Sequence, residues 1–527
     1  MGSHEWPTRG LLAHRAGTTP QRTAVIDAET GSTWTYEDLD ARADRLACRL
    51  EATTPDSLDR IGVLLDTGPA FATLLFAGMR TGTTLVPLNV RETPAELTGK
   101  IDRTDPAAIV CERETESTAL EVADRSGEPD DSIPVLSVDG SERADSTGDD
   151  ARGASSDGPA VDPVALEPAD TCLILFTSGT TGEPKGVRLT VGNLVASATA
   201  SAFRLGVDPD DRWLCCLPMY HMGGLAPVVR STLYGTAAVL QRPFDRHETQ
   251  RVLEAYDCTG VSLVPTMVDR LLEAGWEPTD RLRFVLLGGA PATDELLERC
   301  RATGVPVYPT YGMTETASQV ATATPAAATT HEGTVGQPLV CTDVTVVDEE
   351  GDPLPAGESG ELVVSGPTVT PGYLEPGTTN EAFGEYGLQT GDIGYRDDDG
   401  RLWVLNRRSD RIVTGGENVD PGAVLEVLRS HPTVEDAAVV GLDDSEWGER
   451  VAALIVPADG SDAGTDSTAD FDLESLLEHC KSRLAGFKRP KTIGVTGALP
   501  RTASGTVDRD AVRGRLLEDG TDVTSSP

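Results

Sequence analysis

The 527-residue chain lacks the features that would place it in a membrane or on a secretory route. It contains no run of 18 apolar residues, so we expect no transmembrane helix. The segment Met1 to Pro7 shows no basic-then-apolar pattern, so no secretory signal is expected. The nine cysteines are scattered and form no CxxC pair, which favours reduced thiols in a cytoplasmic protein over a disulfide framework or a zinc site.

Lysine is also scarce, and the chain is strongly acidic. Only five of the 44 basic residues are lysine, against 85 Asp and Glu, and the net charge is −41. Such a surface repels phosphates and argues against a nucleic-acid partner. It resembles the surface of proteins from salt-loving organisms, because molar salt reduces the Debye length to about 3 Å and screens self-repulsion. The alternative is an ordinary acidic protein that tolerates this charge at low salt.

The length of the chain predicts at least two domains, since 527 residues are too many for one hydrophobic core. Helix-like and strand-like runs alternate before residue 120 and again from 172 to 320, which predicts parallel α/β sheets. Short strands between Gly and Pro turns from 340 to 405 suggest a small β-barrel. Residues 125–165 and 458–470 are acidic and of low complexity, and are interpreted as an insert and a loop. The predicted strands are Arg60–Leu65, Thr84–Leu88, Ala107–Cys111, Leu282–Leu287 and Ala437–Leu442, and the predicted helices are Thr35–Glu51, Thr293–Ala302, Gly422–Ser430 and Leu473–Leu484.

The most informative segment is Leu175–Val187, which follows an apolar run. It combines three glycines, four hydroxyl side chains and one lysine. Glycines allow backbone N–H groups to surround an anion, while hydroxyls and a lysine add donors and positive charge. No Gly-Lys-Ser/Thr opens a helix here, so it is not a Walker loop. The segment predicts a phosphate loop with these residues: Thr177, Ser178, Gly179, Thr180, Thr181, Gly182 and Lys185.

The sequence TSGTTGEPKGV resembles the phosphate loop of the adenylate-forming enzymes, a family of acyl- and aryl-CoA ligases, peptide-synthetase adenylation domains and luciferases. The resemblance extends from Leu11 to Arg513. It implies an α/β fold with a large N-terminal AMP-binding domain (1–406), built from parallel-sheet subdomains and a small β-barrel. A hinge (407–410) and a small mobile C-terminal α+β domain (411–527) would follow. The implied ligands are ATP, Mg²⁺ and coenzyme A, with self-association left open.

Further motifs in the family's order imply the remaining site residues. By resemblance, His221 lies beside the carboxylate being activated, Thr314 donates to the α-phosphate, and Glu315 holds Mg²⁺. Asp392 accepts hydrogen bonds from ribose, and Arg407, at the hinge, contacts ribose or phosphate. Adenine would pack against the turn after a predicted strand and against an aromatic motif, and the pantetheine arm would pass a glycine pair; the residues concerned are Gly288, Gly289, Ala290, Pro291, Tyr311, Gly312, Gly415 and Gly416.

One position departs from the family pattern. The family's C-terminal Gly-Lys element bridges the carboxylate and the α-phosphate during adenylation, but here Thr506 stands in place of the lysine. Either another cation substitutes, or Mg²⁺ and Lys185 suffice, or adenylation is slow. The substituting cations considered are Lys488, Lys491, Arg501 and Arg509.

Within the family, the segments Tyr311–Gln319 and Gly333–Leu339 are most similar to the o-succinylbenzoate–CoA ligases of menaquinone synthesis. The resemblance implies ATP-dependent formation of a CoA thioester through an acyl-adenylate. Arg230 and Gln319 are candidates for binding the polar end of a dianionic acid. Alternatives are another aryl- or fatty-acid–CoA ligase, or a nucleotide-binding homologue with impaired adenylation. The acyl pocket is expected to include Ser262, Val264, Pro265 and Thr266.

The net charge generates a testable prediction. We expect the chain to keep its far-UV circular dichroism in molar KCl and to lose structure on dilution into low salt, because unscreened repulsion among the carboxylates destabilises the compact state. Adding KCl back before aggregation should restore the spectrum. An unchanged spectrum at low salt would favour the ordinary acidic protein.

Overall fold

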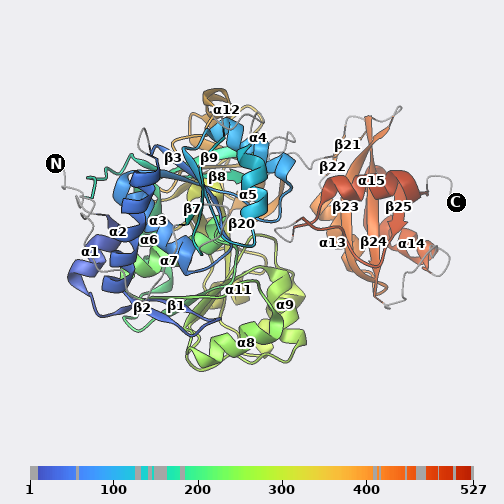
Figure 1. Ribbon diagram of the computed structural model, residues 1–527. Coiled ribbons are helices and arrows are strands. Elements are labelled where there is room, and N and C mark those ends of the chain that lie inside the picture. Colours follow the sequence, from blue (N-terminus) through green and yellow to red (C-terminus); the bar gives the residue numbers. More distant parts are fainter. Residues whose placement is uncertain are drawn as a thin grey trace. The chain divides into compact units, whose positions relative to one another are not determined.

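The computed structural model describes most of the chain (Figure 1). The described residues are 10–54, 58–124, 132–139, 145–146, 163–177, 184–407, 412–414, 417–419, 421–444, 448–458, 471–484, 486–502 and 506–523. The chain divides into two compact units. The first comprises Met1–Thr345, Val363–Gln389 and Asp399–Leu402, and the second Val346–Leu362, Thr390–Asp398 and Trp403–Pro527.

An eight-stranded sheet in the order β15-β14-β13-β12-β10-β11-β1-β2 belongs to the first unit. All its neighbouring strands pair in parallel except β15 and β2 at its two edges, which pair antiparallel with β14 and β1. The inner strands β11 and β13 are continuous apolar runs, as expected where both faces are covered. The bounds are β1 Thr23–Asp27, β2 Thr33–Thr35, β10 Arg212–Cys215, β11 Ala237–Leu240, β12 Gly260–Leu263, β13 Phe284–Leu287, β14 Val307–Met313 and β15 Ser318–Thr322.

A seven-stranded sheet in the order β7-β6-β5-β3-β4-β8-β9 is the second sheet of this unit. It is parallel except for the pair β8 and β9. The strands β6 and β7 lie in the segment interpreted from sequence as an acidic insert, so part of that segment extends the sheet. The bounds are β3 Arg60–Leu64, β4 Thr84–Pro87, β5 Ala108–Cys111, β6 Val135–Ser137, β7 Asp145–Ser146, β8 Thr171–Thr177 and β9 Lys185–Thr190.

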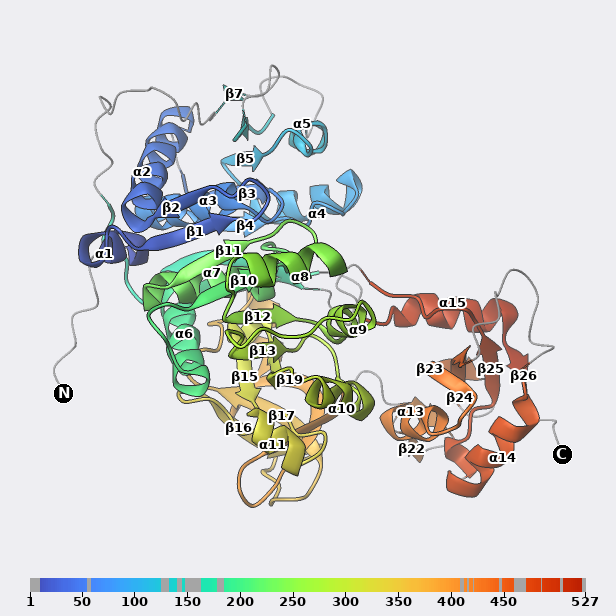
Figure 2. The ribbon, with the colours of Figure 1, turned by 90° about the horizontal axis from the view of Figure 1, so that it is seen from below.

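Helices cover both faces of both sheets, as Figure 2 shows. One apolar core lies between the sheets and includes side chains from α2, α3, α6 and α7. A second joins α8, α9 and α10 to the outer face of the eight-stranded sheet, and a third joins α4 and α5 to the outer face of the seven-stranded sheet. The bounds are α1 Leu11–Thr18, α2 Tyr36–Thr53, α3 Pro69–Thr81, α4 Pro94–Thr104, α5 Glu116–Ala123, α6 Val191–Leu205, α7 Met222–Tyr234, α8 Arg246–Ala255, α9 Pro265–Glu273, α10 Asp294–Ala302, α11 Pro325–Thr330 and α12 Pro376–Ala382.

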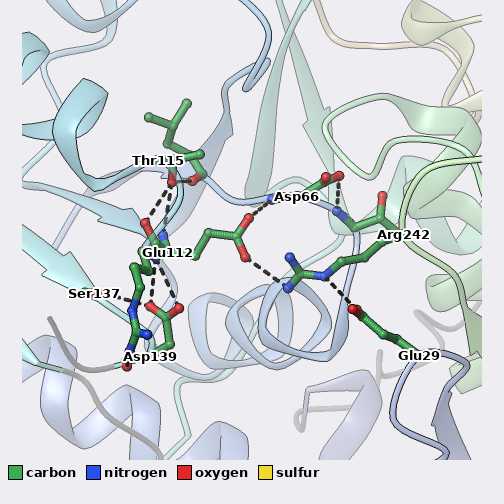
Figure 3. A network of polar contacts seen from close by, with 10 residues as sticks. Glu29, Asp66, Glu112, Thr115, Ser137, Asp139 and Arg242 are labelled. Atoms are coloured by element: carbon green, nitrogen blue, oxygen red, sulfur yellow. Dashed lines mark hydrogen bonds and ion pairs between the residues drawn. The ribbon is translucent and has the colours of Figure 1, made fainter.

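A buried carboxylate joins the two sheets near the ends of their strands (Figure 3). Glu112 follows β5; its Oε1 accepts a hydrogen bond of 2.8 Å from the backbone N–H of Asp66, which lies beyond β3. Its Oε2 lies 3.0 Å from Nη2 of Arg242, which follows β11. Burial raises the pKa of Glu112, and the Asp66 hydrogen bond and the Arg242 charge oppose that effect. The pair therefore links the ends of β3 and β5 in the seven-stranded sheet to the end of β11 in the eight-stranded sheet.

Residues 343–407 form a five-stranded sheet in the order β16-β17-β19-β18, with β20 beside β19. The structure has this sheet where the short strands between Gly and Pro turns predicted a small β-barrel. The bounds are β16 Asp343–Val347, β17 Gly360–Ser365, β18 Phe383–Gly384, β19 Gly387–Arg396 and β20 Leu402–Arg407.

The C-terminal part has a six-stranded sheet in the order β22-β21-β24-β25-β26, with β23 beside β24. Apolar side chains of α13 and α14 pack on one face of this sheet and those of α15 on the other, which is the expected α+β arrangement. The bounds are β21 Ile412–Thr414, β22 Glu417–Val419, β23 Val434–Asp444, β24 Gly448–Pro457, β25 Thr492–Val495, β26 Thr521–Asp522, α13 Pro421–Arg429, α14 Leu473–Arg483 and α15 Arg509–Asp519.

The predicted elements agree with the structure to within a few residues. The helix expected at Thr35–Glu51 is α2, and Thr35 and Asp38 form the predicted capping box. The α/β fold class is confirmed. Among the described residues, no helix has both the length and the apolar character to cross a membrane.

Candidate active site

The predicted phosphate loop connects β8 to β9. Thr177 is the last residue of β8 and pairs with Lys185, the first residue of β9. The buried, apolar β8 thus holds both ends of the loop at one place on the seven-stranded sheet. Five predicted loop residues lie outside the described residues: Ser178, Gly179, Thr180, Thr181 and Gly182.

Three side chains that are far apart in the sequence meet beside this loop. Glu315 belongs to the 3-10 turn Thr314–Thr316 that follows β14, and it is 6% exposed. Its Oε1 accepts a hydrogen bond of 3.1 Å from the hydroxyl of Tyr373. The Nζ of Lys185 lies 5.6 Å from the centre of the Tyr373 ring, within cation–π range. Two predicted site residues, Lys185 and Glu315, therefore contact the same tyrosine.

Glycines on the eight-stranded sheet allow close packing where adenine is expected. Gly288 follows β13, and a Cβ there would lie 2.6 Å from Cγ2 of Thr310. Gly312 lies in β14 beside Tyr311, and a Cβ there would lie 1.7 Å from the Ser318 carbonyl oxygen. Gly289, at φ +81°, turns the chain before Ala290 and Pro291. These residues lie at the carboxyl ends of parallel strands, where open α/β sheets bind ligands.

His221 is the N-cap residue of α7 and packs edge-on against Tyr220, with ring centres 4.8 Å apart. Burial lowers the pKa of His221 to about 4, and the charges of Lys100 and Arg91 act in the same direction. The imidazole is therefore neutral near pH 7, and a neutral ring can hydrogen-bond a substrate without adding charge.

Two cations beside β8 were missed by the sequence analysis. Lys100 and Arg103 both belong to α4. The Nζ of Lys100 and the Cζ of Arg103 lie 5.3 and 5.2 Å from the centre of the Phe176 ring. Arg103 Nη1 also donates a hydrogen bond of 2.6 Å to the carbonyl of Pro184, just after the phosphate loop. The scarcity of lysine was the signal that could have identified the buried Lys100.

A buried arginine, Arg230 of α7, lies on the expected acyl side of the site. Arg230 is 2% exposed, and among the described residues its Nη2 has no hydrogen-bond partner. The guanidinium lies 5.3 Å from the centre of the Trp213 ring, and Trp213 donates a hydrogen bond of 3.1 Å to Oγ of Ser262. Burial lowers the pKa of Arg230 to about 10, so the side chain remains charged at pH 7. Of the other predicted pocket residues, Val264 caps α9, and Pro265 and Thr266 open it.

Gln319 of β15 is the second predicted polar group of this region, and it is 1% exposed. Its Nε2 donates a hydrogen bond of 2.7 Å to the hydroxyl of Thr322, which lies 2.8 Å from the hydroxyl of Thr310. Its Oε1 is buried, and no residue in the described part of the chain donates a hydrogen bond to it. The two residues suggested for a polar substrate end thus each present a buried polar atom that the described residues leave unpaired.

The remaining predicted residues belong to the second unit, described by itself. Asp392 is buried in β19, and its N–H donates to the hydroxyl of Thr390. Arg407 ends β20, but its side chain lies outside the described residues, as do Gly415, Gly416 and hinge positions 408–410. The Thr506 hydroxyl lies 2.7 Å from that of Thr502. Of the cations considered as substitutes for the absent lysine, Arg501 is paired with Asp436 at 3.1 Å.

The chemistry of Glu315 fits a magnesium ion that is bound mainly by substrate. Among the residues that the structure describes, no three His, Cys, Asp or Glu side chains converge as a metal site. Magnesium commonly takes one or two carboxylates and completes its octahedron with water and substrate phosphates. The buried Glu315 carboxylate, which contacts the same tyrosine as the loop lysine, fits that pattern.

Comparison with known proteins assigns the chain to a class. Residues 12–374 match the family described as AMP-binding enzyme, and residues 424–506 match the AMP-binding enzyme C-terminal domain. The chain therefore belongs to the AMP-binding enzymes, as its fold and motifs indicated.

The relatives of the chain include 2-succinylbenzoate–CoA ligases. The chain is 36% identical over 511 residues to a 2-succinylbenzoate–CoA ligase of Bacillus mycoides, covering 96% of this chain and 98% of that protein. It also resembles the o-succinylbenzoate CoA synthetase (MenE) of Bacillus subtilis, solved with the acyl-adenylate intermediate OSB-AMP, at 32% identity and a TM-score of 0.83 over 96% of this chain and 98% of that one. The same enzyme with ATP and magnesium gives a TM-score of 0.82 at 32% identity, over 97% and 99% of the two chains.

The depressed pKa of His221 predicts a pH dependence of stability. In the unfolded chain His221 has a pKa near 6.5 and is protonated below that pH. In the folded chain the same side chain is protonated only below about pH 4. This contribution to stability is complete above pH 6.5 and is lost as the pH falls towards 4. In urea titrations, wild type should lose roughly 1–3 kcal/mol more unfolding free energy over this range than His221→Gln. Equal losses in both proteins would contradict the assignment.

Proposed function

We propose that the chain is an ATP-dependent acid–thiol ligase that converts o-succinylbenzoate to its CoA thioester in menaquinone biosynthesis, releasing AMP and pyrophosphate. Family membership and the full-length similarity to 2-succinylbenzoate–CoA ligases support the reaction. The single observation that carries the choice of acid is the buried, incompletely paired guanidinium of Arg230.

A buried charge without a full set of partners is energetically costly, so Arg230 calls for an anion. An acid with one carboxylate uses that group in the reaction and leaves Arg230 unsatisfied. A dianionic acid brings a second carboxylate, and arginine binds carboxylates well because its planar fork matches their geometry. Gln319 adds only an acceptor at its unpaired Oε1, which suits a neighbouring N–H or water more than a carboxylate. Arg230 is therefore the proposed determinant of substrate choice.

In the proposed first step, the acid's carboxylate attacks the α-phosphorus of ATP, giving acyl-adenylate and pyrophosphate. Lys185 and the phosphate loop hold the phosphates, Thr314 donates to the α-phosphate, and neutral His221 orients the carboxylate. Tyr311 and the turn Gly288–Pro291 bind adenine. Bound at Glu315, Mg²⁺ would supply positive charge to the phosphates. Positioning and charge stabilisation dominate phosphoryl-type transfers, which suits this set of groups.

In the proposed second step, the CoA thiol displaces AMP from the acyl group. The family resemblance implies that the C-terminal domain rotates about residues 407–410 between the steps, a domain closure of a known type. Asp392 and Arg407 would then bind ribose and phosphate, and Gly415 and Gly416 would let the pantetheine arm pass.

A second candidate function rests on Thr506, which offers no charge where the family has a lysine. Loss of one such electrostatic contact commonly slows a reaction by about two to three orders of magnitude. The chain would then bind nucleotide with impaired adenylation.

ATP–pyrophosphate exchange with o-succinylbenzoate, measured in molar KCl, separates the two functions. The ligase predicts exchange that depends on this acid, is lost in Glu315→Ala and Arg407→Ala, and is followed by CoA thioester formation. ATP binding without exchange would support the second function. A faster reaction with benzoate or a fatty acid would replace the proposed acid.

Replacing Arg230 tests the choice of acid. We expect Arg230→Met to reduce kcat/KM for o-succinylbenzoate by roughly 100-fold and to leave benzoate turnover within about threefold, because only the dianion needs the buried cation. The control is Arg204→Met, since Arg204 of α6 donates, among the described residues, only to the carbonyl of Gln337. Equal losses with both acids would contradict the role of Arg230.

A further inference from the structure

Tyr373, which no motif identified, touches both the predicted metal ligand and the predicted phosphate-loop lysine. Its hydroxyl donates to Oε1 of Glu315 at 3.1 Å, and its ring lies beneath Nζ of Lys185. The side chain is 6% exposed.

The backbone fixes Tyr373 against the strand that carries Lys185. Tyr373 forms an antiparallel bridge with Val187 of β9. On either side, the Leu374 N–H donates to the carbonyl of Gly186 at 2.7 Å, and the Arg188 N–H donates to the carbonyl of Gly372 at 3.1 Å. The position of the tyrosine is thus set by the strand that follows the phosphate loop.

Helix α6 forms separate hydrogen bonds with the segment before Tyr373 and with the segment after Glu315. Asn193 donates two hydrogen bonds, of 2.9 and 2.8 Å, to the carbonyls of Pro367 and Val369, just before Tyr373. One turn later, Ser197 donates at 2.7 Å to the carbonyl of Ala317, just after Glu315. The hydroxyl of Tyr373 therefore joins two segments that other contacts already place, which makes it suited to orienting a side chain.

We propose that Tyr373 is a positioning residue that orients the Glu315 carboxylate for Mg²⁺ and holds Lys185 over its ring, so that metal and phosphate loop act on one nucleotide. The inference rests on the proposed function. A hydrogen bond to one carboxylate oxygen fixes the rotation of the group and stabilises its charged form, and outer partners of this kind commonly change metal affinity by 10–100-fold.

The hydroxyl and the ring make separable contributions. Tyr373→Phe removes only the hydrogen bond to Glu315, whereas Tyr373→Leu also removes the ring beneath Lys185. Binding of ATP in molar KCl, measured by calorimetry with Mg²⁺ and with EDTA, distinguishes them. We expect Tyr373→Phe to weaken Mg·ATP binding by about tenfold and to leave ATP binding in EDTA within about twofold. Tyr373→Leu should weaken both.

The matched control is Tyr256→Phe, which removes a hydroxyl whose one hydrogen bond to a described residue goes to the carbonyl of Ala28. Both affinities should stay unchanged in this variant. In a Glu315→Gln background, Tyr373→Phe should change Mg·ATP binding by less than about twofold, since the carboxylate it orients is gone.

Tight Mg·ATP binding by Tyr373→Phe, or an equal loss with and without Mg²⁺, would overturn the inference while leaving the proposed function intact. Failure of wild type to bind ATP in either condition would instead overturn the proposed function, and this inference with it.

Discussion

The burial of the Arg230 charge is the constraint on which the proposed specificity depends. Helix α7 places this guanidinium against the Trp213 ring, almost out of contact with water, and no described residue accepts a hydrogen bond from its Nη2. A protein core does not tolerate such a group cheaply, so its retention points to an anion that arrives from outside. In the proposed reaction, a second carboxylate on the acid would pair with this cation, which is why a dianionic acid is the proposed substrate.

The same helix begins at His221, whose pKa burial holds near 4. One helix thus supplies a neutral group at its first turn and a cation two turns later. In the proposed reaction, the neutral His221 ring contacts the carboxylate that attacks ATP, and Arg230 binds the second carboxylate of the acid. Reversing these charges would attract the reactive carboxylate into an ion pair and reduce its ability to attack ATP.

The sequence predicted the fold well because strongly apolar runs and helix caps are local signals. The strand Phe284–Leu287 and the box at Thr35 and Asp38 needed no knowledge of their neighbours. Motif order supplied the candidate residues around Lys185 and Glu315. The sequence did not identify Tyr373, because its proposed role depends on pairing with β9, nearly 190 residues earlier. Such long-range pairing produces no periodic pattern in the sequence. The end strands β6 and β7 were missed because acidic, Gly-rich sequence surrounds them.

A crystal structure of the chain with the acyl-adenylate of o-succinylbenzoate tests the central claim most directly. The account predicts that the succinyl carboxylate lies about 3 Å from Nη2 of Arg230, at hydrogen-bond distance. A carboxylate directed into solvent, with the guanidinium still without an anion, would contradict it.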